Sequence, residues 1–272
     1  MAHPQIAVFA RLANGGNAPT RLIAGQQTKL SRTMHDIRYD AVHDEFFVTN
    51  PFAQAILTFR GAANGEEAPI RIIQGPHTEL QTPDVLEIDA VHNEVFVPDT
   101  GMIHVYRRDA QGDVAPLRTL RASGGIGDGS VAVDPLHNVM VLAGSITIEG
   151  KRQAALSIFT RTDEGEAKPR AVISGPKTGL IGIRQIQVYP QKGWIVVTQI
   201  TAGEDPEPEG TFVGVWSIND NGDVPPRWKI EGKPGNVLKK PRGVVLDAKH
   251  KEVIVSDMRL NAVLTYYLPE IF

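Results

Sequence analysis

Nine polar residues occupy two positions that recur along the chain, and their side chains could support binding or catalysis. The strand-start position precedes the first strand of each repeat and holds His35, Asp84, Asp128 (beside Gly129), Arg184 and Arg242. The strand-end position closes the second strand of a repeat and holds Asn50, Asp99, Gln199 and Asp257. Loops on a rigid scaffold commonly carry binding sites, so we expect both positions to meet at the loop-rich mouth of a central channel.

Three kinds of chemistry are open to these residues. The carboxylates of Asp84, Asp99, Asp128 and Asp257 could hold a hard cation, Ca²⁺ or Mg²⁺, through oxygen ligands. Bidentate arginine contacts could instead hold an anionic or sugar-like ligand, and the predicted ligand-binding set is Asn50, Asp99, Arg184, Gln199, Arg242 and Asp257. With His35 or Asp84 as a catalytic base beside a metal ion, hydrolysis or elimination becomes feasible.

The same residue types also have purely structural interpretations. Charges of both signs around one mouth can pair with each other, and Arg38 and Glu87 are placed one step along adjacent first strands to do so. Four histidines share one turn position between the first two strands of their repeats, and recurrence at one position indicates a device of the fold: His43, His92, His137 and His250. Because they belong to four separate repeats, they cannot converge on one metal ion.

The elements that position these residues are set by a phrase that the chain repeats five times. It consists of an aromatic residue, five spacers, a glycine, three spacers and a proline, and it begins at Phe9, Phe59, Tyr106, Phe159 and Trp216. The glycine enters left-handed backbone without steric cost and the proline lacks an N–H donor, so the phrase predicts an outer hairpin. The recurring aromatics are expected to pack between neighbouring repeats.

A second pair of strands precedes each hairpin, as in residues 36–50, 85–99 and 243–257. Four short strands in a unit of roughly 50 residues, with no helical period, are typical of a β-propeller blade. The sequence therefore predicts an all-β propeller of four-stranded blades, with five blades from the count of first strands and six as the alternative. We expect the N- and C-terminal strands to pair and close the ring.

The two termini together supply one strand more than a four-stranded blade needs. Residues 6–9 and residues 262–266 both have the pattern of a third strand, and a four-stranded blade needs only one. Either one blade carries a fifth strand, or the ring is larger, or one copy serves a neighbouring subunit. An oligomer built through the surplus terminal strand is therefore one predicted arrangement.

Two connections between second and third strands are long, at residues 144–153 and 201–210. In a propeller both would project at the same mouth. The acidic stretch 204–209 is either a lid over that mouth or a solvated surface decoration, since surface loops tolerate insertion freely.

Composition and net charge limit which classes of partner and which cellular compartments we expect. The 272 residues are predicted to form a single propeller domain, and a net charge of −3 gives no basic surface for nucleic acid. The absence of cysteine removes disulfides and thiolate metal sites, and no apolar run is long enough to span a membrane. We expect a cytoplasmic protein as the sequence is written, or an exported one whose signal peptide is absent from this sequence.

The last repeat of the chain resembles a known sequence repeat. Residues 241–247, 253–257 and 262–266 resemble the NHL repeat, and the chain is similar in its blade pattern to the wider group of NHL, SMP-30/gluconolactonase and streptogramin-lyase propellers. The resemblance implies the propeller fold. Members of the group include lactone hydrolases, metal-assisted lyases and interaction modules, but the chain shows no match to the metal-ligand set of the lactonases.

Three functions follow from these residues. The first is a binding protein that holds a small molecule or a protein at the channel mouth. The second is a metal-assisted hydrolase or lyase that acts on a lactone- or sugar-like compound at the same mouth, with His35 and Asp84 as catalytic residues. The third is a scaffold that only presents its rim to partners.

Overall fold

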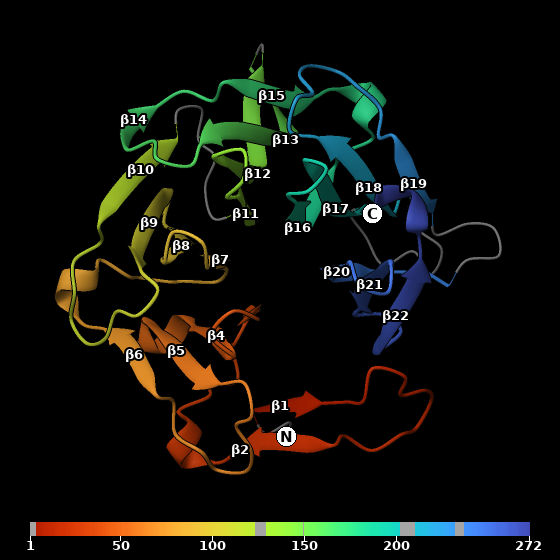
Figure 1. The fold of residues 1–272 in the computed structure, drawn as a ribbon. Helices are drawn as coiled ribbons and strands as arrows, with labels where there is room; N and C mark the ends of the chain where they lie inside the picture. The colour runs from red at the N-terminus through yellow and green to blue at the C-terminus, as the bar shows by residue number, and fades with distance from the viewer. Residues whose placement is uncertain (1–3, 123–128, 149, 202–209, 232–236) are drawn as a thin grey trace. The chain divides into compact units, whose positions relative to one another are not determined.

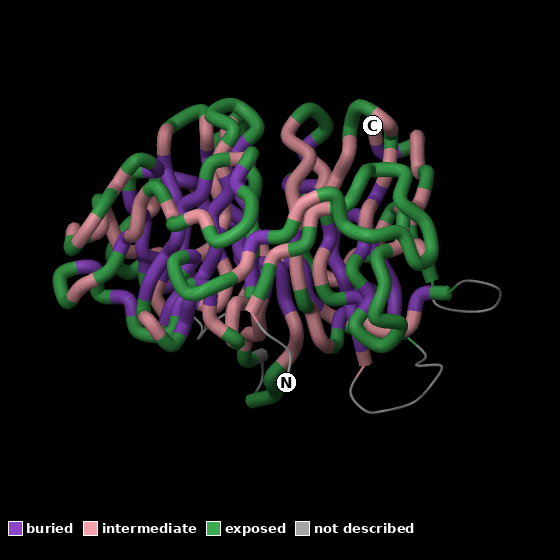
Figure 2. The backbone as a smooth tube through the Cα atoms, turned by 90° about the horizontal axis from the view of Figure 1, so that it is seen from below, coloured by how far each residue is buried: buried purple, intermediate pink, exposed green. Residues whose placement is uncertain are grey.

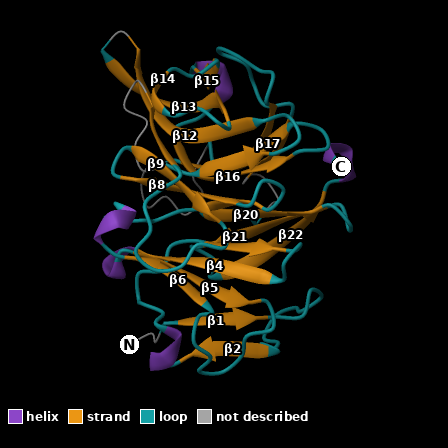
Figure 3. Cartoon of the chain, turned by 60° about the vertical axis from the view of Figure 1, so that its left-hand side comes forward, coloured by secondary structure: helices purple, strands orange, loops and turns teal. Residues whose placement is uncertain are grey.

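Short runs of β-branched and aromatic residues between polar turns form the strands of this protein. The computed structural model describes residues 4–122, 129–148, 150–201, 210–231 and 237–272. Sheets of antiparallel strands, with one parallel pair, make up the fold (Figure 1), and the described helices are 3-10 turns of three residues (Figure 3). Their bounds are Gln26–Thr28, Pro51–Ala53, Pro76–Thr78, Pro176–Thr178 and Pro269–Ile271. In the described part of the chain no helix has the length and apolar character to cross a membrane.

Five sheets correspond to the five predicted blades. Blade one consists of β3 (Ile37–Asp40), β4 (Glu45–Asn50), β5 (Ala55–Arg60) and β6 (Arg71–Gln74). Blade two consists of β7 (Glu87–Asp89), β8 (Glu94–Asp99), β9 (Met102–Arg107) and β10 (Arg118–Ala122), with β14 (Gly165–Ala167) added alongside β10. Blade three consists of β11 (Val131–Asp134), β12 (Val139–Ile148), β13 (Lys151–Thr160) and β15 (Ala171–Ser174).

The remaining strands form two further blades and one small sheet. Blade four consists of β16 (Gly182–Tyr189), β17 (Trp194–Ile200), β18 (Phe212–Ser217) and β19 (Trp228–Glu231). Blade five has three strands, β20 (Pro241–Asp247), β21 (Glu252–Asp257) and β22 (Ala262–Tyr267). A separate two-stranded sheet pairs β1 (Gln5–Val8) with β2 (Arg21–Ala24).

The described contacts divide the chain into two compact units. Unit 1 comprises residues 1–100 and 104–118, and unit 2 comprises residues 101–103 and 119–272. The division falls inside blade two, and the prediction of a single domain over residues 1–272 stays a prediction. Within both units, buried residues concentrate in the strands and exposed residues in the turns (Figure 2).

Each unit has cores between the faces of neighbouring sheets. In unit 1 the two faces of β4 pack in different cores, because Phe46 joins Phe59 and Ile23, whereas Phe47 joins Tyr106 and Leu86. Both faces of this blade are therefore covered by apolar side chains.

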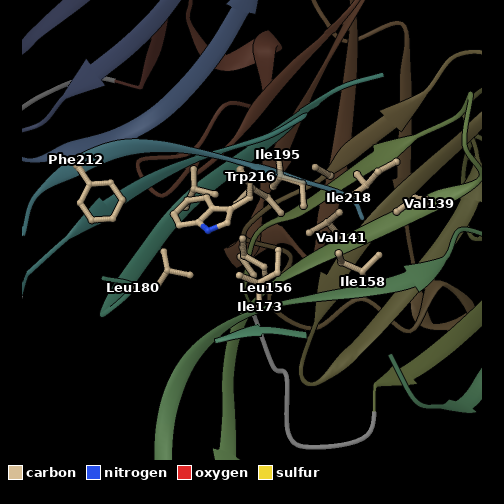
Figure 4. Close-up of a cluster of buried hydrophobic side chains, with 14 residues drawn as sticks. Val139, Val141, Leu156, Ile158, Ile173, Leu180, Ile195, Phe212, Trp216 and Ile218 are labelled. Carbon is tan, nitrogen blue, oxygen red and sulfur yellow. The ribbon is translucent and has the colours of Figure 1, made fainter. Parts of the chain in front are cut away.

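In unit 2 the core shown in Figure 4 joins blades three and four around Trp216, which is completely buried. Burying a large aromatic side chain of this kind stabilises the fold by several kcal/mol. The predicted burial holds for Phe59, Tyr106, Phe159 and Trp216. It is wrong for Phe9, which is 49% exposed, because β1 ends at Val8 and Phe9 lies in the loop that follows.

The glycine of the repeated phrase joins each hairpin to the preceding sheet. Gly65 forms a parallel bridge to Ile23 of β2, and Gly112 and Gly222 each form one to the fourth strand of the preceding blade. Gly165 pairs in parallel with β10 as part of β14. At Gly112, whose φ is 80°, the N–H donates to the Ile72 carbonyl at 2.7 Å. This contact requires left-handed backbone at the glycine.

One detail of the predicted topology stays a prediction and another is wrong for the described strands. β1 pairs with β2 and β22 pairs with β21; the predicted pairing of the N- and C-terminal strands would join the two units, and it stays a prediction. Each terminal strand takes its partner from its own sequence neighbourhood, which has the lower cost of loop closure. Residues 144–153 form the end of a long hairpin between β12 and β13, because Ser145–Ile148 continue the β-branched pattern up to a turn at Gly150.

Candidate functional site

The four strand-end residues share one structural task. Asp99 is fully buried and accepts hydrogen bonds from the backbone N–H groups of Gln81 and Thr82, at 2.5–3.1 Å. Asn50 accepts from the Ala53 N–H at 3.4 Å and donates to the Lys29 carbonyl at 3.0 Å. Both belong to unit 1, and both tie the end of a second strand to neighbouring backbone.

Gln199 and Asp257 do the same in unit 2. The Gln199 side-chain oxygen accepts from two N–H groups at 3.0 Å, those of Ile181 and Gly182. Asp257 accepts four N–H groups, from Lys239, Lys240, Arg259 and Leu260. A ligand or metal ion at these oxygens would have to displace backbone donors, so their predicted binding roles stay predictions.

The strand-start position of unit 1 brings together the two residues predicted as catalytic. His35 Nδ1 lies 3.0 Å from Asp84 Oδ1, and both side chains are substantially exposed. The backbone beside them is fixed by Thr49, whose hydroxyl accepts from the Asp36 N–H at 3.1 Å and donates to the Asp84 carbonyl at 3.0 Å. A histidine oriented by a carboxylate is an arrangement that can move a proton.

Below this pair lies a cluster of buried charges in unit 1. The predicted pairing of Arg38 with Glu87 is confirmed, with Nε 3.4 Å from Oε2, and Asp36 Oδ1 accepts from Arg38 Nη1 at 2.7 Å. Burial raises the pKa of Glu87, although the charge of Arg38 opposes that shift. Arg38 Nη2 is buried with no hydrogen-bond partner among the described residues. These charges satisfy one another largely within the fold.

The strand-start position of unit 2 holds two arginines at matching irregularities. The β16–β17 register shifts between Ile183 and Ile186, at Arg184, and the β20–β21 register shifts between Pro241 and Gly243, at Arg242. Such bulges turn a side chain out of the regular alternation and are common beside functional sites. Both arginine side chains are exposed.

One threonine holds both bulges. Thr198 Oγ1 accepts from the Gln185 N–H at 3.0 Å and donates to the Arg242 carbonyl at 3.1 Å. The Gln185 side chain in turn accepts from the Val244 N–H at 2.6 Å. Thr198 corresponds to Thr49 of blade one, and sequence analysis missed both. The sequence feature that could have identified them is a threonine directly before the strand-end amide in each repeat.

The electrostatics of this arginine pair differ from those of unit 1. Partial burial, and then the positive charge of Arg242, lower the pKa of Arg184. Within the described residues, neither guanidinium has an ion pair with a carboxylate. Asp128 and the acidic stretch 204–209 lie outside the described residues. Two neighbouring cations with no carboxylate partner in the described part of the chain form a local site of positive potential.

An apolar groove of about 480 Å³ runs along β1 in unit 1, and sequence analysis missed it as well. Its walls include Ile6, Val8, Ile37, Tyr39 and Phe46. β1 pairs with β2, and no other strand pairs with β1 in the part of the chain that the structure describes. The groove is open, and its wall also holds Arg21 and Asp44, whose Oδ1 accepts a hydrogen bond from the Tyr39 hydroxyl at 2.8 Å.

Comparison with known proteins shows the fold. No family model matches the chain, and no curated protein matches it. Among solved structures, Kuenenia stuttgartiensis hydrazine synthase is similar with 12% identity and a TM-score of 0.57, over 93% of this chain and 68% of that one. The WD40 β-propeller domain of Doa1 is similar with 12% identity and a TM-score of 0.51, over 85% of this chain and 78% of that domain. The chain has an all-β, five-bladed β-propeller fold.

Proposed function

We propose that the protein binds a small anionic ligand, a carboxylate or phosphate compound, through Arg184 and Arg242. The observation that carries the proposal is the placement of two arginines at matching bulges of adjacent sheets, held by one threonine, with no carboxylate partner among the described residues. Guanidinium groups bind planar oxyanions through paired N–H donors. A bound anion would also relieve the repulsion that lowers the pKa of Arg184.

Titration with inorganic phosphate, citrate and gluconate, followed by calorimetry and by thermal melting, tests this proposal. A ligand that binds only the folded protein raises the melting temperature. Each charge-assisted hydrogen bond is worth about 1.5–3 kcal/mol, so R184A and R242A should each weaken binding by about 10- to 100-fold. The matched control is R227A, because Arg227 is already paired with Asp220. If none of the anions binds, or if R227A weakens binding as much as R242A, the proposal fails.

The enzyme alternative rests on one distance. His35 lies within hydrogen-bonding reach of Asp84, so a hydrolase or lyase in unit 1 would use His35 as base and Asp84 to orient it. Turnover of a chromogenic ester or lactone that is lost in H35N but kept in H77N would support it; His77 is likewise exposed and paired with an aspartate. Melting with Ca²⁺, Mg²⁺ or EDTA tests the predicted metal set of Asp84, Asp99, Asp128 and Asp257.

Two further possibilities involve partner proteins: a scaffold function, and an oligomer formed through the surplus terminal strand. The groove along β1, a strand that pairs with β2 alone among the described strands, supports an oligomer formed through this strand. Light scattering of the wild type and of I6K tests it, since a charge at Ile6 would disrupt strand addition. The narrower relationship to the NHL, SMP-30/gluconolactonase and streptogramin-lyase group remains a proposal that rests on the pattern of blade five.

A further inference from the structure

Three copies of the repeated phrase place an asparagine directly before the turn glycine, and such a pair can react within itself. The pairs are Asn14–Gly15, Asn64–Gly65 and Asn221–Gly222. All six residues are exposed, and each glycine has a left-handed φ between 56° and 81°. Because glycine has no Cβ, its backbone nitrogen can approach the side chain of the preceding asparagine without steric hindrance.

Two of the three turns are held by hydrogen bonds to a neighbouring strand. The Gly65 N–H donates to the Leu22 carbonyl at 2.8 Å, and the Gly222 N–H donates to the Val172 carbonyl at 2.7 Å. The side-chain oxygen of the asparagine before each glycine accepts from the N–H of the same strand residue, at 3.4 and 3.0 Å respectively. The nitrogen and the side chain that would have to meet are therefore both bonded to the strand.

In the described part of the chain, the turn at Gly15 forms no bridge to a neighbouring strand. It lies in the loop of residues 9–20 between β1 and β2, and every residue of this loop is exposed. The Asn14 N–H donates to Asn17 Oδ1 at 2.6 Å, and the Asn14 carbonyl accepts from the Asn17 N–H at 3.4 Å. Both bonds use the backbone of Asn14, and neither uses its side-chain amide or the Gly15 nitrogen.

We propose that Asn14 is a site of spontaneous deamidation, with the Gly15 backbone nitrogen as the nucleophile. The nitrogen loses its proton and attacks the side-chain carbonyl carbon of Asn14. A C–N bond forms, and the side-chain amide nitrogen takes up a proton and leaves as ammonia, which gives a cyclic succinimide. Water then opens the ring at either carbonyl, so that position 14 becomes aspartate or isoaspartate. The reaction consumes water and releases ammonia, and it requires no other reactant.

The same reaction at Asn64 and Asn221 requires local opening of the turn. The glycine N–H and the asparagine oxygen must both leave their strand partner first, and only the open fraction of the molecules can react. Loss of two hydrogen bonds keeps this fraction small, so deamidation of Asn14 should be at least about tenfold faster than at either other site.

The modification changes the charge of the loop. Arg11 is the one charged residue in positions 9–20, so the new carboxylate cancels its charge and makes the chain one unit more negative than −3. The strands on either side should stay paired, because the Thr20 N–H and hydroxyl both donate to the Val8 carbonyl, at 2.7 and 3.0 Å. We therefore expect a more acidic form of the folded protein, which anion exchange separates from the original.

Incubation of the full chain at neutral and at mildly alkaline pH, followed by peptide mapping with mass spectrometry, tests the proposal. Trypsin places the three asparagine–glycine pairs in separate peptides. The acid form should accumulate first at Asn14, and faster at the higher pH, because the attacking nitrogen must lose its proton. Methylation by an isoaspartate-specific carboxyl methyltransferase should label the aged protein in the peptide that contains Asn14.

The matched control is the unfolded chain in urea. The hydrogen bonds that protect two of the turns are then absent, so the three sites should deamidate at similar rates. The proposal is overturned if the folded protein modifies Asn14 no faster than the other two sites. It is also overturned if the difference between the sites persists in urea, because neighbouring residues rather than the fold would then set the rates.

Two variants test the role of the nucleophile. G15A should slow deamidation of Asn14, because the added methyl group hinders attack by the backbone nitrogen, whereas G16A should leave the rate unchanged. Equal rates in the two variants would exclude the Gly15 nitrogen as the nucleophile. The comparison of the three sites in the wild type depends on neither variant, so it decides alone if G15A does not fold.

Discussion

Replacement of Asp257 by asparagine should destabilise unit 2 by about 3 kcal/mol, because the carboxylate organises two loops. Oδ2 accepts from the Lys239 and Lys240 N–H groups at 2.7 and 2.8 Å, and Oδ1 accepts from Arg259 and Leu260 at 3.0 and 3.1 Å. Asparagine keeps one acceptor oxygen and places an NH₂ group against the other two donors. Two hydrogen bonds to a charged acceptor, at about 1.5–3 kcal/mol each, are then lost, and partial rehydration of the loops lowers the total.

Thermal and urea unfolding measure this change directly. A loss of about 3 kcal/mol corresponds to a fall of roughly 6–12 °C in the melting temperature of a domain of this size. D109N is the control, because Asp109 forms an exposed pair with Arg107, and exposed pairs contribute about 0–1 kcal/mol. An unchanged midpoint for D257N would refute the structural role. If the same variant also lost a melting response to Ca²⁺, the carboxylate would instead serve as a metal ligand.

Three further perturbations test other parts of the structure. G112A should lose about 1–2 kcal/mol in urea unfolding, because alanine is strained at a φ of 80°, whereas G16A should be neutral, because its φ is not left-handed and no atom lies near its added methyl group. T198V should weaken anion binding by releasing both arginine bulges, and T49V, the equivalent change in unit 1, should not; equal effects would contradict the proposed site. Burial raises the pKa of Glu87, so the folded state retains this proton at higher pH than the unfolded chain does, and stability from this group falls as pH rises through the raised pKa. In E87Q the melting temperature should not show this decrease with pH. If E87Q has the same pH dependence of melting as the wild type, Glu87 is not the source of the decrease.

The blade structure could be predicted because its signals are local. A proline without an N–H, a glycine with a left-handed φ and a buried aromatic each act within one hairpin, so the phrase that begins at Tyr106 already defines the outer strands. The bridge from Gly112 to Ile73 could not be predicted in the same way, because it joins residues from different sheets. The partners of the terminal strands are hard to predict for a related reason, because the shared third-strand pattern of residues 6–9 and 262–266 does not reveal which partner each strand takes.

The candidate site was predicted in part. Superposition of the repeats placed Arg38 beside Glu87, and the structure has this pair. It put His35 and Asp84 at equivalent positions of neighbouring repeats but did not predict that they pair, as they do in the structure. The use of Asp257 could not be read from the sequence, because an aspartate that accepts backbone N–H groups looks the same as one that binds a cation. The bulge at Arg184 also left no signal, since a bulge is a mismatch between two strands rather than a property of one.

The contrast between the two recurring positions indicates where function is to be sought. At the strand-end position the residue types differ, but Asp99 and Asp257 perform the same backbone task, and so does the Gln199 amide. A position whose chemistry can vary between acid and amide without changing its contacts is constrained by the fold. At the strand-start position the contacts themselves differ, with Asp84 paired to a histidine and Arg184 left beside a second cation. Repulsion between two adjacent positive charges is unfavourable, and no carboxylate among the described residues pairs with either arginine, so this position is where we propose an anion to bind.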